Sequence, residues 1–408
     1  MNWLCAALVS FSAAIVATAQ APPPSIPLHV SEVGGIRRTQ FPVTARIPFP
    51  RGVLKDPANV KLLNNQTEVA GQAMAETRWP DGSVQWLSLD LNVTIGPNES
   101  QTYSLQYGDG VRAEATARGL TVTEDADAIQ VGNMRFNKSG SPLIASVKYR
   151  DESVGSGANG LTVKDATGMV HDLTTAENVK AEIVKRGPLV VVLNYSGSIR
   201  LDKNVKAPFS LTVEMPNSKS WVKLHAAVDD PTQAIRDLAI NVPLALGPFP
   251  WVWDFGTTRW TYGSMRTATD SVVMSDTVGA TATGDWTVSS GPKGREVAAE
   301  TSGPDAASFG GWGHVQGAKE VVAYAIEGVK TRRGTYRIAI DGSGQTTFQV
   351  SAPAPQAKHE LTVYAHFVST PVQIGAATSP AAILSPLFAT CEREQYVKSG
   401  VPVPPSVR

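Results

Sequence analysis

Residues 77–91, TRWPDGSVQWLSLDL, combine a tight turn with an alternating apolar run. Pro80 suits the second position of a type I or type II turn, and Gly82 supplies a residue that tolerates a positive φ. After the turn, a leucine occupies every second position of 87–91, so the leucines share one face of a strand. The stretch therefore predicts a β-hairpin whose leucine face points toward a core.

Two tryptophans, Trp79 and Trp86, flank this turn. Trp86 falls on the strand face opposite the leucines. An aromatic pair that clamps the hairpin and a flat platform for a sugar ring both account for such a pair. We favour the structural interpretation, because the residues belong to a hairpin that local chemistry already explains.

The rest of the chain repeats the strand pattern. Turn sequences such as Gly108-Asp109-Gly110 separate the runs, and short strands between turns are typical of barrels and sandwiches. The sequence therefore predicts an all-β fold. Further strand patterns occupy 188–199, 209–215, 221–228, 238–246, 320–326, 335–340, 346–350 and 360–368.

One short C-terminal helix is expected. Ser385 suits an N-cap and Pro386 the first helical position, after which Leu387, Phe388 and Cys391 share a face. The remaining tail, 399–408, has the composition of a linker.

The ends and the polar breaks divide the chain into segments. Residues 1–19 end in Ala17-Thr18-Ala19, an A-x-A cleavage signal, which predicts a signal peptide and a secreted protein, extracellular or periplasmic, with no membrane contact after cleavage. A polar, glycine-bearing break at 108–118 predicts a small barrel over 20–112 and a large β-sandwich over 113–384. The helix and tail then occupy 385–408.

Charge and cysteine content exclude several classes of function. The chain has 36 basic and 36 acidic residues and no basic run, so a nucleic-acid partner is not expected. Cys391 is the sole cysteine after signal cleavage, which rules out an intrachain disulfide and suggests a small buried apolar residue. Histidine spacing typical of metal sites, phosphate loops, calcium loops and the G-x-S-x-G motif are absent, so no metal or cofactor is expected.

The segment PFPRGVLKDPANVKLL (48–63), followed by the hairpin, resembles the N-terminal RIFT barrel of the exo-rhamnogalacturonan lyase and YetA-like family. Segments 309–326 and 358–367 are similar to the central β-sandwich of that family. The matching residues are Pro48, Phe49, Pro50, Arg51, Gly52, Leu54, Asp56, Pro57, Arg78, Trp79, Pro80, Asp81, Gly82, Ser83 and Trp86.

The resemblance implies a carbohydrate-active protein that acts on or binds acidic, uronate-containing polysaccharide, with β-elimination as the implied reaction. In the family an α/α toroid follows the sandwich, and the sequence ends at Arg408, where it would begin, so we expect this chain to lack it. A non-catalytic carbohydrate-binding or assembly module therefore stays open, as does a structural secreted β-protein without a ligand. Whether the protein is an enzyme stays open too.

Elimination from a uronate needs a group that neutralises the carboxylate and a base that removes the C5 proton. The sequence contains such residue types without a diagnostic spacing, so no catalytic residue is assigned. His225 and His366 fall within strand patterns and are interpreted as core histidines. His314, among glycines and beside Trp312, is the best histidine candidate for a site.

The segment 247–266, GPFPWVWDFGTTRWTYGSMR, is the main candidate for carbohydrate binding. Gly and Pro interrupt its pattern, which predicts a long loop. Aromatic faces stack on sugar rings, and arginine binds carboxylates and hydroxyls. The alternative is that the aromatic side chains plug one end of the sandwich or bury its interface with the barrel. With His314, the candidate residues are Trp251, Trp253, Arg259, Trp260, Tyr262 and Arg266.

Overall fold

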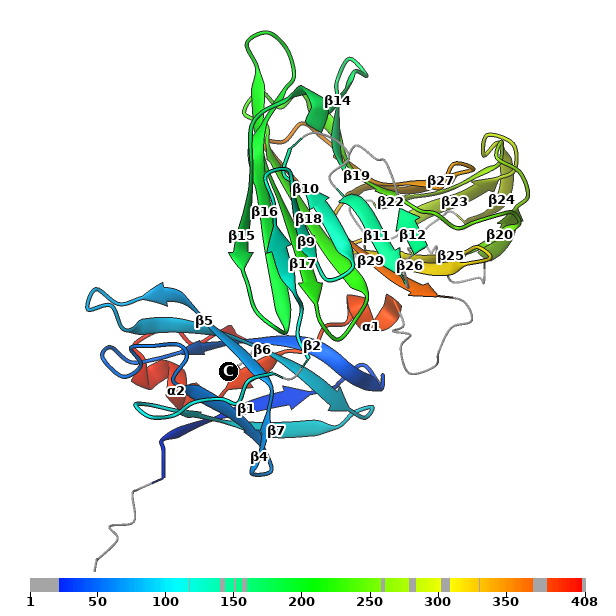
Figure 1. Ribbon diagram of the computed structural model, residues 1–408. Helices are drawn as coiled ribbons and strands as arrows, with labels where there is room; N and C mark the ends of the chain where they lie inside the picture. The colour runs from blue at the N-terminus through cyan, green and yellow to red at the C-terminus, as the bar shows by residue number, and fades with distance from the viewer. Residues whose placement is uncertain are drawn as a thin grey trace, which may run out of the picture.

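The fold is nearly all β, as predicted (Figure 1). A barrel formed mainly by N-terminal strands lies beside a larger stack of sheets (Figure 1). The predicted signal peptide lies outside the residues that the structure describes. The computed structural model describes residues 22–116, 118–139, 144–149, 152–155, 160–257, 261–278, 284–301, 309–329, 331–369 and 380–405.

The barrel is one eight-stranded sheet with the order β4-β3-β7-β1-β30-β2-β6-β5. Alternating residues of each strand point inward, and the buried set includes Leu28, Leu89 and Leu105. The strands are β1 (Ser25–Ser31), β2 (Arg38–Pro48), β3 (Val60–Asn64), β4 (Thr67–Val69), β5 (Gly71–Arg78), β6 (Val84–Ile95), β7 (Ser100–Tyr107) and β30 (Ala389–Cys391).

The hairpin predicted from residues 77–91 is confirmed as β5–β6. The amide of Gly82 donates to the carbonyl of Trp79 at 2.9 Å, and Gly82 has a φ of 82°, which an L-side chain rarely adopts. The two tryptophans have separate partners. Trp79 donates its indole N–H to the carbonyl of Phe49, whereas the Trp86 ring lies 6.3 Å from that of Tyr396.

Truncating Trp86 is expected to lower the stability of the barrel. Its ring contacts Tyr396 and accepts a cation–π contact from Arg46 at 5.0 Å, so Trp86→Ala removes both contacts. We expect a loss of about 2 kcal/mol in the free energy of unfolding, measured by chemical denaturation, because the side chain is only partly buried. Trp86→Phe, which keeps an aromatic ring, should lose less. Unchanged stability with lost saccharide binding would contradict this structural role.

Three further sheets share one hydrophobic core. A nine-stranded sheet has the order β15-β16-β17-β18-β29-β26-β25-β20-β21. Its strands are β15 (Ala176–Lys185), β16 (Val190–Arg200), β17 (Lys206–Pro216), β18 (Trp221–Asp229), β20 (Trp251–Phe255), β21 (Thr261–Met265), β25 (Trp312–Gln316), β26 (Glu320–Ile326) and β29 (Lys358–Ser369).

An eight-stranded and a five-stranded sheet contribute the other side of this core. The eight-stranded sheet contains β13 (Leu161–Asp165), β14 (Val170–Asp172), β19 (Ile235–Pro243), β22 (Ser271–Val278), β23 (Gly284–Ser290), β24 (Glu296–Thr301), β27 (Gly334–Asp341) and β28 (Gln345–Ser351). The five-stranded sheet contains β8 (Val122–Glu124), β9 (Ala128–Val131), β10 (Met134–Asn137), β11 (Ile144–Tyr149) and β12 (Glu152–Gly155), and a 3-10 turn covers Leu173–Thr175.

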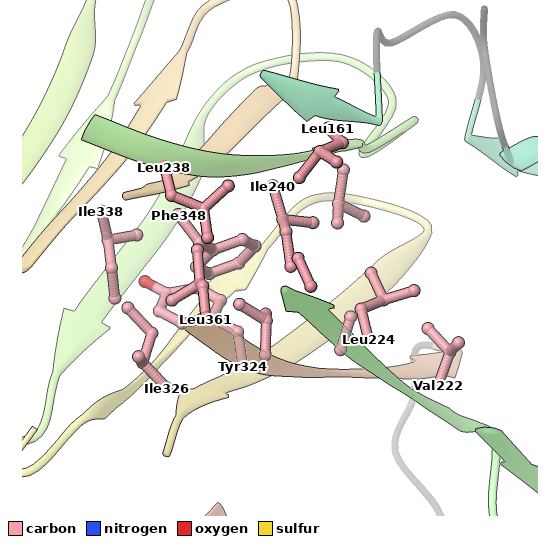
Figure 2. Close-up of a cluster of buried hydrophobic side chains, with 14 of the residues drawn as sticks. Leu161, Val222, Leu224, Leu238, Ile240, Tyr324, Ile326, Ile338, Phe348 and Leu361 are labelled. Carbon is pink, nitrogen blue, oxygen red and sulfur yellow. The ribbon is translucent and has the colours of Figure 1, made fainter. Parts of the chain in front are cut away.

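Figure 2 shows how the layers of the sandwich meet. Ile240 and Phe348 from the eight-stranded sheet lie against side chains from the nine-stranded sheet, among them Leu224 and Leu361. Each of these four residues is at most 2 % exposed. Because the inner face of the nine-stranded sheet is filled in this way, its opposite, outer face is the one that remains for polar side chains.

The helix predicted to begin after Ser385 is wrong. Two short helices, α1 (Pro380–Leu384) and α2 (Arg393–Lys398), flank the strand β30. β30 pairs with β1 and inserts Ala389 and Cys391 into the barrel core, so tertiary pairing overrides the local helical pattern. The expectation that Cys391 is a buried apolar residue is confirmed, since its thiol is 2 % exposed and burial raises its pKa to about 12.

Buried polar contacts join the barrel to the nine-stranded sheet and the segment leading into it. The Gln72 side chain donates to the carbonyl of Val190 at 2.9 Å and accepts the amides of Leu189 and Val190 at 2.8 and 3.0 Å. Lys185 Nζ lies 3.0 Å from Asp90 Oδ2. These hydrogen bonds and this ion pair are directional and mostly buried. They therefore hold the barrel in a defined orientation on the sandwich.

Candidate functional site

β20 and β21 form an antiparallel pair within the segment 247–266, so the prediction of a long loop is wrong. Trp251, Trp253 and Phe255 alternate along β20 and all face the core. Trp251 and Trp253 are 4 % and 2 % exposed, so their rings are not available for stacking on a sugar. For these two residues the alternative interpretation holds, in which the aromatic side chains fill the sandwich.

The other candidate residues of this segment are dispersed. Tyr262 lies on the outer face of the sheet and is 64 % exposed. Arg266 is exposed beyond the end of β21, in a turn where its amide donates to Asp270. Arg259 and Trp260 lie outside the described residues.

The structure places His314 in an accessible group of side chains, which we call the His314 cluster. His314 Nδ1 lies 2.8 Å from Asp254 Oδ1, with the two side chains 32 % and 30 % exposed. The Trp312 ring is 5.6 Å from the imidazole, and Tyr262 lies opposite Asp254 on β21. Of the seven predicted binding residues, Tyr262 and His314 are the pair that the structure places together at the surface of the described part.

A second polar site lies on the same outer face, across β17, β18 and β29. Antiparallel register aligns side chains into rows that cross the three strands. The first row is Glu214, Lys223 and Tyr364, and the second row is Thr212, His225 and Thr362. The rows follow directly from alternation, because every second residue of β17, β18 and β29 points away from the core.

The turn between β26 and β27 closes one side of these rows. Glu327 donates its amide to the carbonyl of Thr362 at 3.0 Å, which anchors the turn to β29. The two rows and this turn line an open hollow of about 370 Å³, which we call the outer groove. Its lining consists of Thr212, Glu214, Lys223, His225, Glu327, Arg332 and Thr362.

The outer groove holds a cation and a neutral base in adjacent rows. Burial disfavours the charge of Lys223, but the electrostatic effects of Tyr364 and Glu214 outweigh it and raise its pKa. Burial lowers the pKa of His225, whose Nδ1 forms a 2.9 Å hydrogen bond with Thr362 Oγ1. At neutral pH the groove therefore presents an ammonium group beside an uncharged imidazole.

Sequence reasoning missed the outer groove and placed His225 in the core. The structure places His225 half-buried on the outer face, whereas His366 is 1 % exposed and is a core histidine as predicted. A signal was present, because polar residues occupy every second position of 210–214, 223–225 and 358–362. It marks one polar sheet face, but the sequence does not show which strands are neighbours.

Within the described ranges, no group of three or more His, Cys, Asp or Glu side chains is placed to hold a metal ion. In the same part of the chain, no helix is both long and apolar enough to cross a bilayer.

Comparison with known proteins identifies the barrel. Residues 28–108 match the PcRGLX-like N-terminal RIFT barrel domain, which confirms the RIFT-barrel part of the resemblance. No curated protein matches the chain in sequence.

Solved structures resemble the chain over most of its length. A protein of glycosyl hydrolase family 38 from Enterococcus faecalis has 10 % identity and a TM-score of 0.56, covering 90 % of this chain and 47 % of its own. An alpha-mannosidase from Enterococcus faecalis V583 has 12 % identity and a TM-score of 0.55, covering 90 % and 46 %. The chain thus spans less than half the length of these proteins. At such identities the likeness describes the fold alone.

Proposed function

We propose that this protein is a secreted, carbohydrate-active protein related to exo-rhamnogalacturonan lyases, and that it binds uronate-containing oligosaccharide in the outer groove. The observation that carries the proposal is the placement of Lys223 and Arg332 in one hollow with hydroxyl and carboxylate side chains. The match of residues 28–108 to the PcRGLX-like barrel supports the same substrate class. Secretion is part of the proposal and rests on residues 1–19.

The chemistry of the groove suits a sugar acid. An ammonium and a guanidinium attract a carboxylate, and the guanidinium offers paired N–H donors. Glu214 and Glu327 accept hydrogen bonds from sugar hydroxyls, while Thr212 and Thr362 both donate and accept. Glu327 and Arg332 are exposed to solvent, so we expect modest affinity that falls as salt concentration rises.

Binding is tested by titrating uronate oligosaccharides into the full chain by calorimetry. We expect Lys223→Met to weaken binding at least tenfold, because the groove loses its central cation. Lys55→Met, which removes an exposed lysine in the barrel, is the matched control and should bind like the wild type. Equal affinity of the wild type and Lys223→Met, or equal binding of neutral oligosaccharides, would refute the groove as the site.

A second candidate function is β-elimination at the same site, favoured by the neutral imidazole of His225 beside Lys223. In this reaction the imidazole accepts the C5 proton of the uronate while Lys223 and Arg332 neutralise the carboxylate. The electron pair of the C5–H bond then forms the C4–C5 double bond. The C4–O bond breaks, and the departing oxygen leaves with a proton from solvent.

Elimination is tested by following the absorbance of the unsaturated product. Because the pKa of His225 lies below its usual value of 6.5, we expect activity to be complete at neutral pH and to fall as acid protonates the imidazole. His225→Gln keeps a polar side chain beside Thr362 and should lose activity about a hundredfold. Turnover by His225→Gln at the wild-type rate would exclude this base. Binding without turnover would leave the non-catalytic function.

A further inference from the structure

A second hollow adjoins the outer groove at one end of the sandwich, and we call it the end pocket. It has a volume of about 320 Å³ and lies where β27, β28 and β29 meet the β26–β27 turn. Arg332 lines both hollows, so the two are neighbours. The end pocket is lined by Arg332, Arg333, Tyr336, Val350, Ala352, Pro353, Gln356, Lys358, His359 and Glu360.

The charge of the end pocket favours an anion. Among its described lining residues are three cationic side chains, Arg332, Arg333 and Lys358. Glu360 supplies the single carboxylate of this set. Glu360 lies 2.8 Å from Lys358 Nζ but 3.9 Å from Arg332, which leaves the guanidinium groups largely available. An excess of positive charge in a concave, partly desolvated site attracts carboxylate or sulfate groups.

Buried side chains form the floor of the end pocket. His359 is 1 % exposed, and burial lowers the pKa of its imidazole, so the ring is neutral. Its Nε2 lies 3.6 Å from the fully buried Asp230, and its Nδ1 lies 3.2 Å from the amide nitrogen of Gln356. Val350, Ala352 and Pro353 add an apolar wall. A ring with one apolar face and one charged edge fits such a lining.

We propose that the end pocket is a second saccharide subsite, which takes a carboxylate-bearing unit of the same acidic chain that lies at least two units from the unit in the outer groove. The inference rests on the proposed function and adds that the ligand is recognised through at least two of its acidic units. Arg332 would lie between the two units, and Arg333 would contact only the unit in the end pocket.

The test compares short and long ligands on matched variants. Digalacturonate and tetragalacturonate are titrated into the wild-type full chain, Arg333→Gln and Arg295→Gln, an exposed arginine at the β23–β24 turn. We expect the wild type and Arg295→Gln to bind the tetramer at least tenfold more tightly than the dimer. Arg333→Gln should bind the dimer like the wild type but lose the gain from length. A methyl-esterified tetramer, which lacks the charges, should show no such gain.

The outcomes separate the two proposals. If the wild type binds the dimer but gains nothing from length, or if Arg333→Gln keeps the gain, the second subsite is refuted while the outer groove stands. If neither oligomer binds, both proposals fail. Arg333 is exposed, so its replacement should leave the melting temperature unchanged, which is measured alongside.

Discussion

Arg38→Met is expected to lower the free energy of unfolding by about 3–5 kcal/mol, as measured by chemical denaturation. Arg38 is 1 % exposed, and its guanidinium lies 3.1 Å from Glu32 Oε1. It also donates to the carbonyls of Ala382 and Ser385, which belong to α1 and the residue after it. The variant removes the cation beside a buried carboxylate, which keeps the backbone amide donors of Gly34, Ile36 and Asn98. It also leaves two carbonyls without this donor.

A second variant shows whether the loss comes from leaving the Glu32 carboxylate without its cation. Glu32→Gln/Arg38→Met removes both charges, and we expect it to be more stable than Arg38→Met alone, because a buried pair is costlier to break than to remove. Hydrogen exchange at 389–391 should accelerate in the single variant, because Arg38 holds the chain that leads into β30. Equal stability of the single and double variants, with unchanged exchange, would show that the ion pair contributes little.

The contrast between the hairpin and the C-terminal segment shows what local sequence can predict. The turn at Pro80–Gly82 and the pairing of β6 with β5 join residues close in sequence, so local chemistry predicted β5–β6 correctly. β30 pairs with β1 through Leu28 and Cys391, more than 300 positions apart. Its helical pattern was misleading because the buried partners of Ala389 and Cys391 lie in a barrel formed at the other end of the chain.

The candidate sites also combine features that local sequence can predict with features that it cannot. The alternation of Trp251, Trp253 and Phe255 already describes a strand with a buried aromatic face, but the surrounding Gly and Pro residues favoured a loop. His314, singled out beside Trp312, lies partly exposed against Asp254, and its role in binding stays a prediction. The outer groove combines side chains from β17, β18 and β29 with a turn after β26. Only the strand order of the nine-stranded sheet brings them together.

Replacing Glu320 by Gln is expected to stabilise the protein by about 3 kcal/mol at pH 7 and to change its response to pH. Glu320 is 1 % exposed and shares its face of β26 with Val322 and Tyr324, inside the sandwich core. Neither carboxylate oxygen has a hydrogen-bond partner in the part of the chain that the structure describes. Burial raises the pKa of this carboxyl from 4.5 to about 8.

The direction of the pH effect on stability follows from the difference in proton binding between the folded and unfolded states. Between about pH 4.5 and pH 8 the folded state keeps the proton of Glu320, whereas the unfolded state has released it. Stability therefore falls as pH rises through this window and levels off above it. A glutamine does not titrate, so the variant avoids this penalty. At pH 4, where both states of the wild type are protonated, the two proteins should differ little.

The measurement is the free energy of unfolding from pH 4 to pH 9 for the wild type, Glu320→Gln and Glu182→Gln, an exposed glutamate on β15. The difference between the wild type and Glu320→Gln should grow by roughly 1.4 kcal/mol per pH unit within the window. Glu182→Gln should follow the wild type throughout, because its carboxylate is solvated in both states. Parallel curves for the wild type and Glu320→Gln would mean that Glu320 is ionised in the folded protein. It would then need a partner that balances its charge in the core, because an unpaired carboxylate at this depth costs several kcal/mol.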